Sequence, residues 1–154
     1  MKTVSICHIC IPEVEANTLY GPCDVFAACN GLWHAMTGKT ATAECQFAPQ
    51  VVGETVEPII SSFGFPILPQ ARYADIDKTD VVFVPSLLVT DFDGFRLRYR
   101  DLVDWIRRQY EGGALVATAC TGTLLLAETG LLDGAEATSH WAASPLMRQY
   151  HPAV

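Results

Sequence analysis

Residues 114–128, A-L-V-A-T-A-C-T-G-T-L-L-L-A-E, decide the fold class of this chain. Residues 114–119 are a short apolar run typical of a buried strand, and residues 121–128 have the composition of an apolar helix. Cys120 lies at the junction. A strand that turns sharply into a helix lifts the junction residue out of the sheet edge and places it below the unpaired N–H groups of the helix. The stretch therefore predicts an α/β protein with Cys120 as a candidate nucleophile.

Cys120 and His140 each have two interpretations. The positive end of the helix dipole favours a thiolate at Cys120, whereas a free cysteine is also among the most buried residue types and could be a small core residue. His140 follows residues 135–139, which are predicted to form a short strand after the turn at 132–134. A histidine on this neighbouring element could deprotonate the thiol. The alternative is a structural histidine.

Three motifs surround these residues: A-C-T-G at 119–122, L-L-A-E-T-G-L-L-D-G at 125–134 and A-T-S-H-W at 137–141. With these motifs the chain resembles the ThiJ/PfpI superfamily, which has the class I glutamine-amidotransferase-like fold. More narrowly, it is similar to the branch that precedes AraC-type DNA-binding domains in bacterial transcriptional regulators. The resemblance implies an open, mostly parallel α/β sheet with helices on both faces, of the flavodoxin-like, ThiJ/PfpI type.

The resemblance also implies a domain organisation. Residues 1–154 are expected to form a single ThiJ/PfpI-like domain, without the DNA-binding domain of such regulators. Domains of this family usually continue past the helix predicted at 144–150 with a further strand and a closing helix. Either these elements are supplied differently, or the sequence is a fragment of a longer protein, truncated at its C-terminal end. An uncovered sheet edge or helix face favours self-association, and we therefore expect a homodimer.

Composition fits one such domain. The chain has 154 residues, 50% of them hydrophobic, which is enough for a single core. No apolar run approaches the roughly 20 residues needed to cross a bilayer, and the N-terminus lacks a signal-peptide layout, so we expect a cytoplasmic protein without a membrane partner. The net charge of -7 argues against direct nucleic-acid binding, which needs clustered Lys and Arg.

The six cysteines are expected to be free thiols. Cys7 and Cys10 have the C-x-x-C spacing of redox and metal sites. They lie in the β-rich segment 3–11, however, where residues three apart point to opposite faces. The four histidines share no chelating spacing with cysteines or carboxylates. We therefore expect neither a metal site nor a cofactor.

The other segments alternate between strand and helix patterns, as in a parallel sheet. Strands are predicted at 3–11, 44–53 and 80–85, with a small hairpin within 54–68. The pair Gly21-Pro22 is expected to open the first helix, because proline fits a first helical turn. Its apolar residues recur every three or four positions and are expected to face the sheet: Val25, Phe26, Cys29, Leu32, Trp33 and Met36.

A longer helix is predicted over residues 95–110, ending at Gly112-Gly113. Asp101 and Asp104 are interleaved among its five arginines, which indicates a solvated face rather than a nucleic-acid stripe. Four of its residues are expected to point inward: Tyr99, Leu102, Val103 and Ile106.

Ligands of open α/β sheets bind beyond the carboxyl ends of the strands. Catalytic relatives carry an Asp or Glu close to the cysteine, three residues before the G-P pair that opens the first helix. Thr18 occupies that position here, and a threonine cannot act as a carboxylate partner. Glu13 and Glu15 lie upstream; they either reach the pocket or are exposed loop carboxylates.

A second departure concerns the backbone donors for an oxyanion. Relatives carry a Gly-Gly pair after the proline that ends the strand at Pro85, and this chain has Ser86-Leu87. Their side chains restrict the backbone, so the donors are expected to be absent or aimed elsewhere, leaving the Thr121 N–H alone. Loss of one such donor costs on the order of a hundredfold in rate.

Cys120 and His140 remain while the carboxylate and the glycines do not, which favours a pocket that binds without chemistry. We therefore expect a non-catalytic ligand-sensing N-terminal domain of an AraC-type regulator. By resemblance, its ligand is a small polar metabolite, such as an amino-acid or quaternary-amine derivative. The expected ligand-binding residues are Thr18, Pro85, Ser86, Leu87, Cys120, Thr121 and His140.

Two other functions stay open. A cysteine-dependent hydrolase, hydratase or amidase would use Cys120 as the nucleophile, His140 as the proton shuttle and the Thr121 N–H as the oxyanion donor. An oxidation sensor would form a reversible sulfenic acid at Cys120.

Four aromatic residues could form a cation-binding wall or be ordinary packing: Tyr20, Phe92, Phe95 and Trp141.

Overall fold

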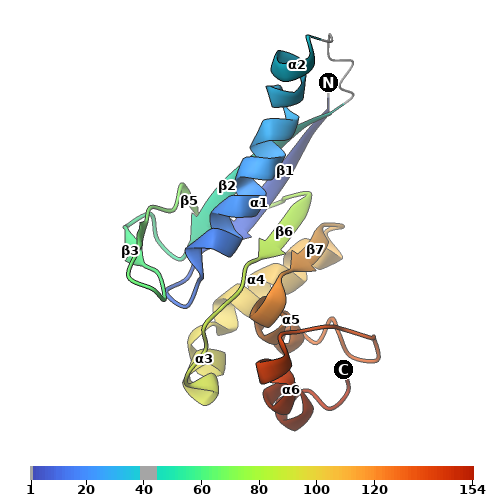
Figure 1. The fold of residues 1–154 in the computed structure, drawn as a ribbon. Coiled ribbons are helices and arrows are strands. Elements are labelled where there is room, and N and C mark those ends of the chain that lie inside the picture. The colour runs from blue at the N-terminus through green and yellow to red at the C-terminus, as the bar shows by residue number, and fades with distance from the viewer. Residues whose placement is uncertain (1, 39–44) are drawn as a thin grey trace.

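The computed structural model describes residues 2–38 and 45–154, apart from the side chains of residues 33 and 34. Its main sheet has five strands in the order β5-β2-β1-β6-β7, and every pairing in it is parallel (Figure 1). This is the predicted open parallel sheet. Its strands are β1 (Lys2–Ile9), β2 (Cys45–Gly53), β5 (Ala71–Arg72), β6 (Val81–Val84) and β7 (Leu115–Thr118).

Helices pack on both faces of this sheet. α1 contacts β1 and β2, whereas α4 contacts β7 and α5 contacts β6. The ring of His8 on β1 lies against Phe26 of α1, so its strand neighbour Cys7 points to the opposite face. The helices are α1 (Ala16–Cys29), α2 (Leu32–Thr37), α3 (Phe92–Arg98), α4 (Arg100–Glu111), α5 (Thr123–Glu128) and α6 (Ser144–Tyr150).

The small hairpin predicted within 54–68 is present. β3 (Ile59–Ile60) pairs antiparallel with β4 (Pro66–Ile67) outside the main sheet. The strands predicted at 3–11, 80–85 and 114–119 are also confirmed, as is the helix at 144–150. The strand predicted at 44–53 is confirmed from Cys45, and Glu44 lies outside the described residues.

The predicted start of the first helix is wrong. α1 begins at Ala16, and Pro22 lies inside it. A tertiary contact sets the start: the backbone N–H of Glu15 donates to the Ser86 carbonyl at 3.0 Å, which anchors the chain before the helix. Proline keeps a helical φ and removes one backbone hydrogen bond, and the fully buried Leu19 in the preceding turn contributes packing that offsets this loss.

The apolar stripe of this helix does not face the sheet. Val25, Leu32 and Met36 are 63%, 54% and 75% exposed, and Cys29 is exposed as well. Phe26 alone of the described stripe packs inward, against His8 and Phe47; the Trp33 side chain lies outside the description. The physical reason is the narrow sheet beneath, because β6 pairs with only the last part of β1 (Figure 1).

The helix predicted over 95–110 begins earlier and is broken. α3 starts at Phe92, capped by the Asp91 side chain, which accepts from the Gly94 N–H at 3.0 Å. Tyr99 separates α3 from α4 with a φ of -102° and a ψ of 24°. Its hydroxyl is held by Glu13, a contact that no local pattern reveals. The four predicted inward residues are all buried, and the helix ends at Gly112 as expected.

The segment 135–139 is not a strand. It has no ladder partner in the described structure, and β7 forms the edge of the sheet.

The six cysteines are free, as predicted. Burial raises the pKa of the Cys10 thiol to about 12, so this cysteine is inert at neutral pH. Within the described ranges, no helix is long and apolar enough to cross a membrane.

Candidate functional site

Cys120 occupies a strained turn between β7 and α5. Its φ of 54° is left-handed, and no other non-glycine residue among those described has a positive φ. This conformation costs about 1 kcal/mol or more for an L residue, and it turns the side chain outward. Cys120 is exposed, so the interpretation as a small core residue is wrong. The Cys120 thiol is therefore accessible at the surface of the protein.

Close packing makes this turn possible. A Cβ at Gly122 would lie 2.3 Å from the Pro85 carbonyl oxygen and 2.5 Å from Thr118 Oγ1. Glycine therefore allows the start of the helix to approach the end of β6 and the last residue of β7. This contact brings the loop after β6 beside Cys120.

The segment before His140 is fastened to the turn. Thr123 Oγ1 donates to the carbonyls of Cys120 and Thr138, at 3.0 and 2.9 Å, and Ser139 Oγ donates to the Cys120 carbonyl at 3.3 Å. The bond to the Thr138 carbonyl satisfies a backbone acceptor that a strand would have paired with a neighbouring strand. The three bonds together attach residues 138–139 to the Cys120 turn rather than to the sheet.

His140 is oriented by the backbone rather than by Cys120. Its Nδ1 accepts from the Ala142 N–H at 3.2 Å, which places the proton of the neutral ring on Nε2. A ring in this tautomer can donate a hydrogen bond from Nε2 to an anion, but it has no free lone pair for a thiol proton. No hydrogen bond joins Cys120 and His140 in the described structure.

The two amides after β6 are occupied by threonine hydroxyls. The Ser86 N–H donates to Thr18 Oγ1 at 3.0 Å, and the Leu87 N–H donates to Thr121 Oγ1 at 2.9 Å. Ser86 Oγ also lies 3.0 Å from Thr121 Oγ1, and Thr18 Oγ1 donates to the Glu15 carbonyl at 2.9 Å. Donors that an oxyanion would need are already engaged within the protein.

A short antiparallel bridge carries Glu15 to the site. Val14 pairs with Leu87, and the Leu88 N–H donates to the Glu13 carbonyl at 2.8 Å. The Glu13 side chain turns away, to the Tyr99 hydroxyl at 2.5 Å and Arg98 Nη1 at 2.6 Å. Burial, and then the hydrogen bond to Glu13, raise the pKa of Tyr99. Only Glu15 of the two upstream carboxylates therefore reaches the pocket.

These elements enclose a cavity of about 240 Å³, called the Cys120 cavity here. Of the expected ligand-binding residues, Ser86, Leu87, Cys120, Thr121 and His140 line it, whereas Thr18 and Pro85 do not. The rest of the lining is one carboxylate and a mainly apolar set: Glu15, Leu88, Val89, Leu124, Ala142, Ala143 and Leu146.

The four aromatic residues considered for a cation-binding wall are absent from this lining. Phe92 and Phe95 are buried core residues, so the packing interpretation holds for both. Tyr20 and Trp141 are exposed, and neither lines the Cys120 cavity. Trp141 is 80% exposed and lies beside the His140 ring. The helix and loop registers, rather than the residue types, exclude these four rings from the cavity.

A second cavity adjoins the first through Glu15. It measures about 280 Å³ and is lined by Glu15, Ala16, Asn17, Phe63 and Phe65; it is called the hairpin cavity here. The two phenylalanines lie in the turn of the β3–β4 hairpin, on either side of Gly64, and are 63% and 61% exposed. The sequence analysis missed them. The available signal was S-S-F-G-F at 61–65, a turn with two unburied aromatic residues.

Family comparison follows from this fold and site. The sequence profile of the DJ-1/PfpI family matches residues 4–153. The chain belongs to the DJ-1/PfpI family. This confirms the ThiJ/PfpI resemblance that the motifs around Cys120 indicated. In the described part of this DJ-1/PfpI domain, no three His, Cys, Asp or Glu side chains gather as metal ligands.

Relatives of this DJ-1/PfpI domain include an enzyme and regulators. Isonitrile hydratase of Pseudomonas putida is 28% identical over 144 residues, which are 94% of this chain and 55% of that protein. The HTH-type transcriptional regulator CdhR of Pseudomonas aeruginosa is 33% identical over 95 residues, or 62% of this chain and 27% of the regulator. This chain thus spans about half of the first relative and about a quarter of the second.

A solved structure shares the fold. An AraC family transcriptional regulator from Pseudomonas putida matches with a TM-score of 0.73 at 16% sequence identity, over 97% of this chain and 74% of that chain. Domains with this architecture therefore occur in transcriptional regulators.

Proposed function

We propose that this chain is the non-catalytic, ligand-sensing N-terminal domain of a cytoplasmic AraC-type regulator. Residues 1–154 then form one domain, and a C-terminal domain of a longer protein binds the DNA. The relatives named as regulators support this assignment. The net charge of -7 supports DNA binding by another domain, since this chain would repel phosphates.

One observation carries the proposal: the Ser86 and Leu87 amides are bonded to the hydroxyls of Thr18 and Thr121. Attack by Cys120 on an electrophilic carbon develops negative charge, which enzymes stabilise with free N–H donors. Here those donors would have to leave their partners, and only the expected donor at Thr121 remains. The Cys120 cavity is present although the N–H donors beside it are engaged, and this combination favours ligand binding over catalysis.

The ligand we propose is a small organic cation. The Glu15 carboxylate borders both the Cys120 cavity and the hairpin cavity, and has no hydrogen-bond or ion-pair partner within the described residues. Phe63 and Phe65 line the hairpin cavity together with Glu15. A carboxylate and aromatic side chains in one cavity attract an alkylammonium group by charge and by cation–π interaction. The mainly apolar Cys120 cavity would hold the remainder.

The backbone holds the hairpin in the position that this site needs. Ser62 Oγ donates to the Glu13 carbonyl at 2.6 Å, and the Ser62 N–H donates to the Val14 carbonyl at 3.1 Å. The turn that carries Phe63 and Phe65 is therefore attached to the same loop that carries Glu15. Aromatic and acidic groups are preorganised, which lowers the entropic cost of binding.

Calorimetric titration with choline, glycine betaine and the neutral isostere 3,3-dimethylbutanol tests this ligand class. We expect choline, which carries a net positive charge, to bind at least tenfold more tightly than the neutral alcohol, and Glu15→Gln to remove that difference. Glu57→Gln, in the exposed loop before β3, is the matched control and should keep it. Equal binding of the cationic and neutral probes would contradict the cation assignment.

A cysteine-dependent hydratase or hydrolase is the second candidate. The exposed Cys120 in a left-handed turn, with His140 lining the same cavity, favours it, as does the similarity to isonitrile hydratase. The measurement is turnover of an alkyl isonitrile alongside the rate of iodoacetamide labelling at about pH 6. Turnover that Cys120→Ala abolishes would replace the sensor proposal. We expect none, and labelling no faster than that of a free cysteine in an unfolded peptide.

A homodimer is part of the proposal. Leu32 and Met36 are exposed and four positions apart on α2, so they share one face of that helix, and Val25 is a further exposed apolar residue on α1; these three residues are called the apolar stripe here. Exposed stripes of this kind mark association surfaces, and a two-fold axis lets one stripe cover another. Light scattering at micromolar concentration measures the mass, and a monomer would contradict the proposal.

A further inference from the structure

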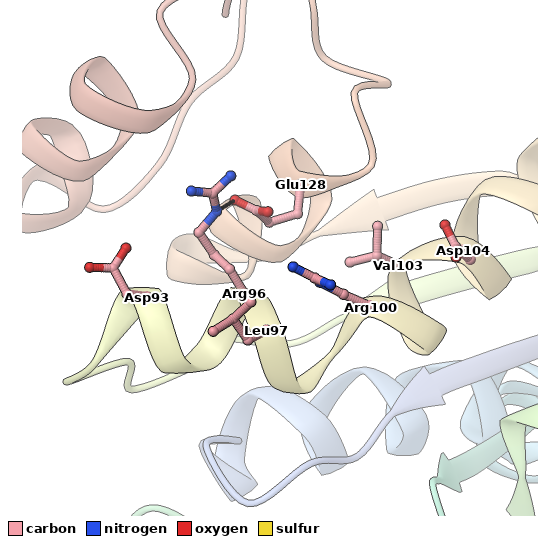
Figure 2. Close-up of a pocket in the computed structure, with 7 residues that line it drawn as sticks. All are labelled: Asp93, Arg96, Leu97, Arg100, Val103, Asp104 and Glu128. Carbon is pink, nitrogen blue, oxygen red and sulfur yellow. Dashed lines mark ion pairs between the residues drawn. The ribbon is translucent and has the colours of Figure 1, made fainter.

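A cavity of about 430 Å³ lies between α3, α4 and α5, and shares no lining residue with the Cys120 cavity; it is called the arginine cavity here. Figure 2 shows Arg96 and Arg100 extending from the same side of α3 and α4, with Asp93 and Asp104 at opposite ends of the row. Glu128, the last residue of α5, faces the arginines. The lining combines charges of both signs.

The three carboxylates already have partners. Glu128 Oε1 lies 2.7 Å from Arg96 Nε and 2.9 Å from His151 Nε2. Asp104 Oδ1 lies 3.5 Å from Arg107 Nη1, which belongs to the same helix. Asp93 accepts a hydrogen bond from the Tyr150 hydroxyl, which raises the pKa of Tyr150. None of the three acids is left for a cationic ligand.

The arginines are not satisfied to the same degree. The Arg100 side chain has no hydrogen bond or ion pair within residues 2–38 and 45–154. Arg96 forms an ion pair with Glu128 through Nε, and its guanidinium carbon lies 5.1 Å from the centre of the Tyr150 ring. Its two Nη atoms make no hydrogen bond in the same described ranges. The unused binding capacity of this cavity is therefore positive, although the whole chain carries a net charge of -7.

We propose that the arginine cavity binds a small aliphatic carboxylate. Planar guanidinium groups match the two oxygens of a carboxylate, so Arg100 and the Nη atoms of Arg96 would hold it as a fork. Leu97 and Val103 also line the cavity and would contact the aliphatic part of the ligand. This site is separate from the proposed cation site in both residues and charge, so either can exist without the other.

Titration with butyrate, followed by amide chemical shifts in a ¹H–¹⁵N spectrum, tests the site. We expect saturable shifts in α3 and α4, none with neutral butyramide, and affinity at least tenfold weaker in Arg100→Gln. Arg108→Gln is the matched control, because it removes the same charge from an exposed position on the same helix, outside this cavity. It should bind butyrate as the parent does.

Three outcomes would overturn the proposal. The first is the absence of saturable shifts with butyrate in the parent. The second is equal weakening by Arg100→Gln and Arg108→Gln, which would reduce the effect to net charge. The third is stronger binding of inorganic phosphate than of butyrate at Arg100, which would assign the cavity to phosphate. Equal melting temperatures of parent and variants would show that an affinity change is not a folding defect.

Discussion

The two ends of the sheet differ in whether other parts of the chain contact their exposed groups. At the carboxyl ends of β6 and β7, side-chain hydroxyls from distant segments engage the backbone around Cys120, as in the bond from Ser86 N–H to Thr18. At the far end, where α2 lies near the start of β1 (Figure 1), the apolar side chains of Leu32 and Met36 are exposed. One end is specified by its own contacts, whereas the other is the surface through which we propose that the chain associates.

The largest expected effect lies at the specified end. Gly122→Ala should destabilise the protein by about 3 kcal/mol or more, because the new Cβ would come within 2.3 Å of the Pro85 carbonyl oxygen and the backbone must shift. Urea unfolding measures the change. Gly31→Ala, whose Cβ would meet nothing within 4 Å, is the control and should change the free energy of unfolding little. Similar losses in both variants would mean that the close approach has no special weight.

The next effect concerns His8, which lies between the sheet and α1. The rings of Phe26 and Phe83 flank it, neither ring nitrogen has a hydrogen-bond partner in the described structure, and burial lowers its pKa from 6.5 to about 4. The unfolded chain therefore binds more protons below its pKa of 6.5, so stability is present above that pH and is lost as pH falls toward 4. We expect a loss of about 2 kcal/mol between pH 7.5 and pH 5.

His8→Leu should remove this part of the pH dependence, since leucine does not titrate. His140→Gln removes a histidine of the site at the other end of the sheet and should keep the dependence. Urea unfolding at both pH values makes the comparison. If the free energy of unfolding of His8→Leu falls with pH as much as that of the parent, the acid sensitivity belongs to other groups.

A smaller effect is expected from Thr121→Val. This change leaves the buried Leu87 N–H without the hydroxyl that it bonds at 2.9 Å, and should cost about 1.5 kcal/mol of unfolding free energy. Thr121→Ser keeps the hydroxyl and should recover most of it. If the valine variant is as stable as the serine variant, the amides after β6 are less firmly engaged than their geometry indicates.

The smallest effect on stability belongs to the uncovered end. Leu32→Glu should change the free energy of unfolding of the chain by less than about 0.5 kcal/mol, because the side chain is more than half exposed. It should nevertheless convert the proposed dimer to a monomer in light scattering. Val56→Glu, at an exposed loop position away from the stripe, should leave the mass unchanged. Loss of the dimer in both variants would show that dimer formation does not depend on the apolar stripe.

Local patterns predicted the fold where the deciding interactions are close in sequence. The turn at Cys120 follows from a strand joined directly to a helix, and the end of α4 follows from its glycines. The start of α1 was missed because Glu15 is anchored by Ser86, and the break at Tyr99 because its hydroxyl bonds Glu13, 86 positions away. Neither partner is visible in a window of neighbouring residues.

Residue types and periodicity therefore predicted the parallel α/β class and the turn at Cys120, and the motifs around Cys120 carried the family resemblance. Only the assembled chain determines which side of α1 is covered, which of Glu13 and Glu15 faces the cavity, and that Thr18 and Thr121 engage the amides after β6. The physical reason is range. Helix and strand preferences arise within a few residues, whereas a cavity is formed by side chains that meet only after the sheet has assembled.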